Sequence, residues 1–116
     1  MMRTIDIGHK HTSLDRAMLA METEISKTIS CEKHSSIKIV HGHGTGVLRI
    51  AVREWCITNA DRFRAIIFGE EHNLFNPASI KMRQESLLPK DRDFGKNNKA
   101  VTYLWLRRGD QSKFVE

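Results

Sequence analysis

Residues 36–55 read SIKIVHGHGTGVLRIAVREW and carry the clearest structural signal in the chain. The first five, Ser36–Val40, form a β-branched run that is typical of a strand. Three glycines follow within five residues, at Gly42, Gly44 and Gly46, and glycine permits the positive φ angles of a tight turn. Apolar side chains then recur at helical spacing. The stretch therefore predicts a strand, a glycine-rich turn and a helix in immediate succession.

The rest of the chain alternates strand and helix patterns around this centre. Alternating or β-branched apolar runs predict three more strands, at residues 3–7, 62–68 and 100–106. Apolar residues at helical spacing predict a helix over residues 13–29, for which Thr12 or Ser13 is the candidate N-cap. A shorter helix is predicted from about residue 76 to 88, with one proline just inside its start and another after its end.

This order predicts an α/β fold built as a two-layer β-α-β-α-β-β sandwich. Strands that alternate with helices pair in parallel, so a four-stranded mixed sheet is expected, with the two main helices on one face. Residues 69–98 form an insertion with an extra helix before the last strand, and that strand is free to pair antiparallel. The 116 residues suffice for a single domain, 1–116, and residues 109–116 are expected to be a flexible tail.

Composition excludes several classes of protein. No apolar run approaches the roughly 18–20 residues that cross a bilayer, which excludes a membrane-spanning protein. The N-terminus enters a strand pattern directly and has no apolar signal-peptide core, which argues against secretion. The two cysteines, Cys31 and Cys56, cannot form a disulfide framework and are expected to be reduced thiols. Together these features predict a cytoplasmic protein.

The positive charge of the chain is concentrated in one region. The net charge is +5, from 19 Lys and Arg against 14 Asp and Glu. Residues 81–108 hold eight of the basic side chains and only three acidic ones. Such a region is either a solvated loop or a patch that contacts phosphates. The composition leaves both interpretations open.

The turn His41–Gly46 has the composition of an anion-binding site. Glycines let the backbone approach a ligand, and the free N–H groups at the start of the following helix point at the same place. A phosphate is the usual occupant, although a simple tight turn has the same composition. The turn is neither a dinucleotide fingerprint nor a P-loop, because no Gly-Lys-Ser/Thr follows. His41 is a candidate general acid or base, since histidine titrates near neutrality.

The segments IVHGHGTGVL (residues 39–48) and AVREW (51–55) resemble the small MutS-related (Smr) domain family. That family has a hydrophobic strand ending in His-Gly-x-Gly-Thr-Gly, followed by Leu-Arg and a helix with Ala-Val-x-x-Trp/Leu. The segment IDI (5–7) matches the start of the family's other signature, Leu-Asp-x-His, on the first strand. The resemblance covers about residues 3–68 and 99–106 and leaves the insertion without a counterpart.

The resemblance implies a nucleic-acid-binding domain, often with endonuclease activity on DNA or RNA. It also implies a fold similar to the C-terminal domain of bacterial translation initiation factor three. The histidine of the second signature maps onto His41, and the aspartate of the first maps onto Asp6. The family's glycines and threonine map onto Gly42, Gly44, Thr45 and Gly46. The histidine of the first signature meets Gly8, so a one-residue shift is needed to bring His9, or even His11, into place.

These residues suggest a site that cleaves phosphodiesters where the ends of the first two strands lie side by side. His41 is the candidate acid or base, Asp6 either orients it or holds a cation, and His9 is expected to approach it. The expected phosphate contacts are Gly42, His43, Gly44, Thr45, Gly46, Lys10, Arg49, Lys96 and Lys99. No resident metal is predicted, and whether cleavage needs Mg²⁺ or Mn²⁺ stays open.

The sequence is also compatible with two other functions. The His-x-His pairs at 9–11 and 41–43 and the Cys-x-x-His at 31–34 have spacings that zinc ligands use, but no cysteine or carboxylate framework completes a set. Alternatively, the domain is a module that binds DNA, RNA or a ribosome without cleavage, with Phe94 or Tyr103 stacking on bases. A separate repair protein is another candidate partner. The sequence does not choose DNA over RNA and does not set the oligomeric state.

Overall fold

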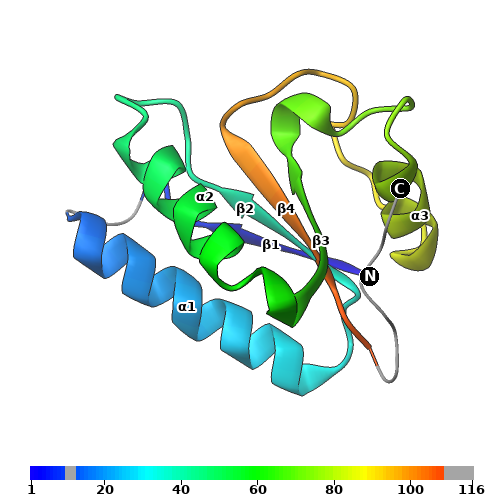
Figure 1. Ribbon diagram of the computed structural model, residues 1–116, viewed down its shortest axis with the longest axis horizontal. Coiled ribbons are helices and arrows are strands. Elements are labelled where there is room, and N and C mark those ends of the chain that lie inside the picture. Colours follow the sequence, from blue (N-terminus) through cyan, green and yellow to red (C-terminus); the bar gives the residue numbers. More distant parts are fainter. Residues whose placement is uncertain (10–12, 109–116) are drawn as a thin grey trace.

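The computed structural model describes residues 1–9 and 13–108 of the chain (Figure 1). Its main elements are β1 (Met2–Asp6), α1 (Leu14–Cys31), β2 (Ser36–Val40), α2 (Val47–Thr58), β3 (Phe63–Phe68), α3 (Pro77–Glu85) and β4 (Val101–Leu106). The predicted elements are present, with ends that differ by a few residues, and the predicted tail lies outside the described residues. None of the helices in the described ranges is long and apolar enough to cross a bilayer.

The four strands form one mixed sheet in the order β1-β2-β4-β3 (Figure 1). β1 and β2 are parallel, and β4 runs antiparallel to both β2 and β3. The last strand in the described residues therefore lies inside the sheet, between the second and the third, and every residue of it is buried. The mixed sheet and its antiparallel last strand confirm the predicted fold class.

The helices α1 and α2 cover one face of the sheet, as predicted (Figure 1). Successive residues of a strand point to opposite faces, so Ile37 and Ile39 of β2 face these helices together. They belong to a hydrophobic core that also contains Met21 and Ile25 of α1 and Val52 of α2, and all five side chains are fully buried. The apolar faces of both helices thus pack against the sheet.

The start of α1 confirms one of its two predicted caps. The Ser13 hydroxyl accepts a hydrogen bond from the Arg16 N–H at 3.2 Å, and Asp15 places a negative charge in the first turn. The other candidate, Thr12, lies outside the described residues. The cap fixes where the helix begins, which is beside the end of β1 and the glycine-rich turn.

The opposite face of the sheet is covered by the insertion, residues 69–98. Met82 of α3 packs with Tyr103 and Trp105 of β4, and all three side chains are buried. Figure 1 shows α3 apart from the other two helices, beyond β3 and β4. The insertion therefore supplies a second hydrophobic core in addition to lengthening a connection.

Candidate nucleic-acid interface

The glycine-rich turn leaves β2 at its C-terminal end and is tied to the start of β4. The backbone N–H groups of His41 and Gly42 both donate to the Ala100 carbonyl, at 2.9 and 3.1 Å. The Gly46 N–H donates to the His43 carbonyl at 3.2 Å and closes the turn. Glycine suits its last position because Gly46 has a φ of 89°. The position of β4 in the sheet thus determines where the turn lies.

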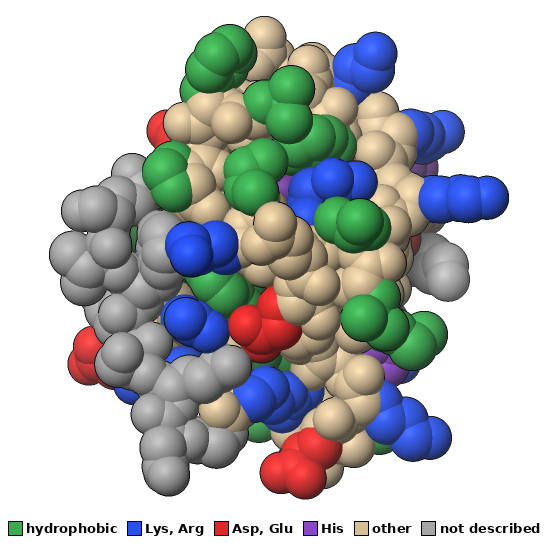
Figure 2. Space-filling model, turned by 90° about the vertical axis from the view of Figure 1, so that its right-hand side faces the viewer, with side chains coloured by type: hydrophobic (Ala, Val, Ile, Leu, Met, Phe, Trp, Pro, Cys, Tyr) green, Lys and Arg blue, Asp and Glu red, His purple; other side chains and the backbone are tan. Residues whose placement is uncertain are grey.

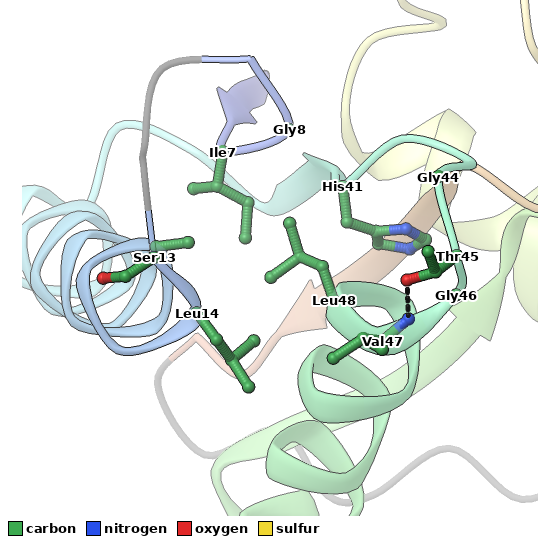
Figure 3. A pocket seen from close by; sticks show the side chains of 11 residues that line it. Ile7, Gly8, Ser13, Leu14, His41, Gly44, Thr45, Gly46, Val47 and Leu48 are labelled. Atoms are coloured by element: carbon green, nitrogen blue, oxygen red, sulfur yellow. Dashed lines mark hydrogen bonds between the residues drawn. The ribbon is translucent and has the colours of Figure 1, made fainter.

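Helix α2 begins directly after the turn, with Gly46 as an N-cap residue that supplies no side-chain cap. The Thr45 hydroxyl accepts a hydrogen bond from the Val47 N–H at 3.4 Å (Figure 3). The next N–H groups have no acceptor within the helix, as at every helix start, and they remain available to an anion. This arrangement is the one expected for a phosphate contact.

A hollow of about 300 Å³ lies between the starts of α1 and α2 (Figure 3). Its lining includes Ile7, Leu14, His41, Thr45, Val47 and Leu48. Two more residues of the turn, Gly44 and Gly46, also border it. Part of the predicted phosphate-binding set is therefore gathered here, beside an apolar wall contributed by both helices.

His41 borders this hollow but is almost fully buried, with 4% of its surface exposed. Its Nε2 lies 2.9 Å from the Thr102 hydroxyl, and its Nδ1 lies 3.3 Å from the Gly42 carbonyl. Burial is the main cause that lowers the pKa of His41 to about 4, and the positive charge of Arg53 lowers it further. The imidazole is therefore neutral at pH 7, with both nitrogens engaged.

Arg53 on α2 holds Thr102 in place. Its Nε donates to the Thr102 hydroxyl at 3.0 Å, and its two terminal nitrogens donate to the two carboxylate oxygens of Glu70 at 2.9 and 2.7 Å. Burial alone would raise the pKa of Glu70, but the hydrogen bonds from Arg53 outweigh it and lower that pKa. By contrast, Arg49, one turn earlier, makes no hydrogen bond or ion pair within the described part of the chain. Its guanidinium lies against Gly46.

Asp6 and His9 form a pair at the end of β1. Nδ1 of His9 lies 3.2 Å from each Asp6 carboxylate oxygen, and the Gly8 N–H donates to Oδ1 of Asp6 at 2.9 Å. A Cβ at Gly8 would lie 3.0 Å from the carbonyl group of His41, so position 8 sits close against the turn. His9 therefore supplies the imidazole beside Asp6, in the place that the one-residue shift predicts.

The His9–Asp6 pair borders a second hollow, of about 490 Å³, which is also lined by Lys38, His43, Arg92 and Asp93. Asp6 lies between Ile5 and Ile7, which are buried in the core under α1 and α2, so its side chain points to the other face of the sheet. His41 instead borders the hollow on the helix side. The structure therefore does not bring Asp6 and His9 to the His41 imidazole, because they lie on opposite sides of the sheet.

The other predicted contacts are divided between the second hollow and the segment that leads into β4. Gly42 and His43 line the second one, and the His43 side chain is exposed. Lys96 and Lys99 are exposed on the segment that leads into β4. Lys10 lies outside the described residues. The turn therefore stands between the two hollows and contributes residues to both.

The basic region, residues 81–108, is only partly available to a ligand. The Arg83 guanidinium stacks 4.2 Å from the centroid of the Phe94 ring. Arg107 and Arg108 donate to backbone carbonyls elsewhere in the fold, so these three cations are occupied internally. Figure 2 shows the face that carries α3, where Lys and Arg side chains are separated by hydrophobic and acidic ones. Part of the basic region is therefore used inside the fold, and its exposed cations are Lys81, Lys90, Arg92, Lys96 and Lys99.

The two aromatic residues that were candidates for base stacking are both engaged in packing. Tyr103 is fully buried and donates its hydroxyl hydrogen to Asp91 at 2.5 Å. Phe94 lies between Arg83 and His72, and its ring centroid is 4.9 Å from that of His72. Both rings are used in packing the insertion onto the sheet.

The zinc interpretation gains no support from the part of the chain that the structure describes. No group of three or more His, Cys, Asp or Glu side chains there is arranged to hold a metal ion. His9 is paired with Asp6 and His41 with Thr102, on different sides of the turn. His11 lies outside the described residues.

Two residues that shape the site, Lys38 and Thr102, were not predicted. Lys38 interrupts an apolar strand, which signals a polar environment on that face, but its partner Asp91 is 53 residues further along the chain. Thr102 carries no signal of its own, because a threonine is ordinary in a strand. Only the pairing of β2 with β4 places these side chains beside the turn.

Comparison with known proteins agrees with this architecture. The model of the Smr domain family matches residues 9–73, which include the turn and both main helices. The crystal structure of the Smr domain of Thermus thermophilus MutS2 is similar in fold, with a TM-score of 0.58, 19% identity, and coverage of 91% of this chain and 99% of that one. No curated protein sequence matches significantly. Because the family match spans more than half of the residues, the chain belongs to the Smr domain family.

Proposed function

We propose that this domain binds the sugar–phosphate backbone of a nucleic acid along the His41–Gly46 turn and cleaves it in the second hollow. The Smr family associates with nucleic acids, which gives the class of ligand. The observation that carries the proposal is the pair of His9 and Asp6, 3.2 Å apart at an exposed hollow beside the turn. An exposed imidazole held by a carboxylate is suited to acid–base chemistry.

Asp6 prepares His9 for proton transfer. The carboxylate accepts the hydrogen on Nδ1, which leaves the lone pair of Nε2 free to take a proton from water. Both carboxylate oxygens lie within hydrogen-bond distance of Nδ1, so the carboxylate favours the tautomer with its hydrogen on that nitrogen. This is the role that the sequence assigned to His41, moved to the other side of the turn.

In the proposed reaction, water attacks the phosphorus atom while one of its protons passes to Nε2 of His9. The bond between phosphorus and the leaving sugar oxygen breaks, and that oxygen takes a proton from His43, which lines the same hollow. A neighbouring phosphate of the strand contacts Arg49 and the N–H groups at the start of α2. Lys96 and Lys99 extend the contact towards β4.

His41 has a supporting role in this proposal. It is neutral, buried and bonded to Thr102, so it joins the turn to β4 and keeps the glycine backbone in place. A group with a pKa of about 4 is a weak base at neutral pH. Replacing His41 is therefore expected to change the stability of the turn more than the proton-transfer step.

The test is a cleavage assay on supercoiled plasmid, single-stranded DNA and structured RNA, each with Mg²⁺, with Mn²⁺ or with a chelator. The variant His9→Gln keeps a polar side chain but cannot transfer a proton, and it is expected to abolish cleavage while binding persists. Asp6→Asn is expected to slow cleavage strongly. The matched control is His34→Gln, at a histidine that borders neither hollow. Full cleavage by His9→Gln contradicts the assignment.

Binding without cleavage is the second candidate function. The observation that favours it is Gly8, which stands where the family signature has a histidine. It is the function to assign if the wild-type protein retains a substrate in a salt-sensitive manner but gives no product with either metal ion. A protein that neither binds nor cleaves any of the substrates contradicts both candidates.

A further inference from the structure

Residues 91–98 lead from the insertion into β4 and lie beside the second hollow. Backbone hydrogen bonds close two successive turns in this segment, from Phe94 to the Asp91 carbonyl at 3.3 Å and from Lys96 to the Asp93 carbonyl at 3.2 Å. The segment is therefore folded on itself, and its backbone has a defined course.

A buried ammonium group anchors this segment to the sheet. Nζ of Lys38 lies 2.6 Å from Asp91 Oδ1 and 2.5 Å from Asp93 Oδ2, and the Lys38 side chain is only 11% exposed. Tyr103 on the neighbouring strand donates to the other oxygen of Asp91 at 2.5 Å. A buried charge that loses its partner is strongly destabilising. Lys38 and the two carboxylates therefore hold one another in a single arrangement.

Arg92 is the residue between the two anchored aspartates, and its exposed side chain lines the hollow that contains the His9–Asp6 pair. Its guanidinium makes no hydrogen bond or ion pair with any residue in the described ranges. The carboxylates that line the hollow are already paired, Asp6 with His9 and Asp93 with Lys38. The charge of Arg92 interacts favourably with that of Asp93 through space, and its N–H donors are left to meet an anion from outside.

We infer that Arg92 binds a backbone phosphate of the nucleic acid in the second hollow and that Lys38 is the positioning residue that directs it there. The inference rests on the proposed function and adds the cation that holds the ligand on the His9–Asp6 side of the turn. A guanidinium offers parallel N–H donors that match two phosphate oxygens, which a lysine in this position would not.

The first test measures the affinity of short fluorescein-labelled single-stranded DNA, RNA and duplex DNA by anisotropy over a range of salt concentrations. Loss of one phosphate contact in Arg92→Ala is expected to weaken binding about fivefold at 0.15 M salt and to lower the salt slope by about one. The matched control is Lys90→Ala, an exposed cation two residues away that does not line the hollow.

The second test separates positioning from simple electrostatics. Asp93→Asn removes a negative charge near the ligand, so electrostatics alone would tighten binding. Weaker binding is expected instead, because Lys38 loses one of its two anchors and Arg92 is no longer held in place. Amide NMR shifts confined to residues 91–100 would show that the fold persists. Asp61→Asn, at an exposed carboxylate outside both hollows, is the control for charge.

The outcomes are distinguishable from a failure of the proposed function. A wild-type protein that binds none of the probes overturns both the function and the inference. Salt-dependent binding by the wild type, with Arg92→Ala indistinguishable from Lys90→Ala, overturns the inference alone. Tighter binding by Asp93→Asn overturns the positioning role of Lys38.

Discussion

The imidazole of His41 and the hydroxyl of Thr102 are hydrogen-bonded, with Nε2 and Oγ1 2.9 Å apart. Arg53 donates its Nε hydrogen to the same oxygen at 3.0 Å, so the hydroxyl hydrogen goes to His41. The proton of the neutral imidazole then lies on Nδ1, facing the Gly42 carbonyl. His41 is thereby a brace between the turn and β4, supported from α2 by Arg53.

Thr102→Val tests this brace, because valine has the same shape but no hydroxyl. Arg53 Nε and His41 Nε2 would each lose a buried partner, so the free energy of unfolding is expected to fall by about 1–3 kcal/mol. Urea unfolding measures this change, and ¹⁵N NMR of the imidazole reports the tautomer of His41. The control is Thr23→Val on the exposed side of α1, which is expected to change stability by less than about 0.5 kcal/mol. Equal effects of the two substitutions would contradict the brace.

Stability is expected to fall as the pH drops from 6.5 towards 4. Burial lowers the pKa values of His41 and His72 from 6.5 to about 4, so the unfolded chain binds more protons than the folded one in this window. The stabilisation is complete above 6.5 and is lost on acidification. The two residues together are expected to remove about 2 kcal/mol between pH 6 and pH 5, and His34 acts in the same direction.

Urea unfolding at several pH values measures this slope. His72→Asn is expected to make the slope about half as steep, whatever its effect on stability at pH 7, because one of the two buried imidazoles is gone. A profile that is flat between pH 6.5 and 4.5 would show that both histidines titrate normally in the folded protein.

Gly69→Ala is expected to be far more damaging than Gly44→Ala. A Cβ at Gly69 would lie 2.0 Å from the Asn98 carbonyl oxygen and 2.8 Å from the Val101 carbonyl oxygen, so backbone must move, and the loss is expected to be about 3 kcal/mol or more. A Cβ at Gly44 meets nothing within 4 Å, and only its φ of 41° opposes the change, by about 1 kcal/mol. Thermal unfolding of both variants measures the difference, and a reversed order would contradict the close packing of Asn98 and Val101 against Gly69.

Arg49 and Arg53 are expected to differ in what they do. Arg53→Gln removes the pairing with Glu70 and Thr102, so it should lower the free energy of unfolding by about 2–3 kcal/mol. Arg49→Gln should leave stability nearly unchanged and lower the salt slope of nucleic-acid binding by about one. Urea unfolding and salt titration of both variants test the pair, and a lost salt slope in Arg53→Gln alone would reverse the assignment.

The elements themselves were predictable from apolar spacing. Ser36–Val40 was predicted to the residue, and the helix predicted over 13–29 is α1, from Leu14 to Cys31. Such patterns depend on neighbours within a few residues, so they can be read along the chain. The turn was predictable in the same way, because glycine is the residue that readily adopts the positive φ angles found there.

The candidate site was predicted only in part. The family signature with a one-residue shift placed His9 at the end of the first strand, where its Nδ1 lies 3.2 Å from Asp6. The expected meeting with His41 failed, because alternation along a strand sends Asp6 and His41 to opposite sides of the sheet. The packing of the insertion against the second face of the sheet depends on contacts such as that of Lys38 with Asp91, two residues that lie 53 positions apart.

Local spacing along the chain thus determined the strands, the helices and the strand–turn–helix order around His41, since each reflects the conformational preferences of adjacent residues. The tertiary structure alone decided that the last strand would lie between β2 and β3. That strand order lets the Ala100 carbonyl accept hydrogen bonds from the turn. It also places Thr102 beside the His41 ring, although the two residues are 61 positions apart in the sequence. Burial of both sheet faces selects it, and burial depends on how whole elements pack together.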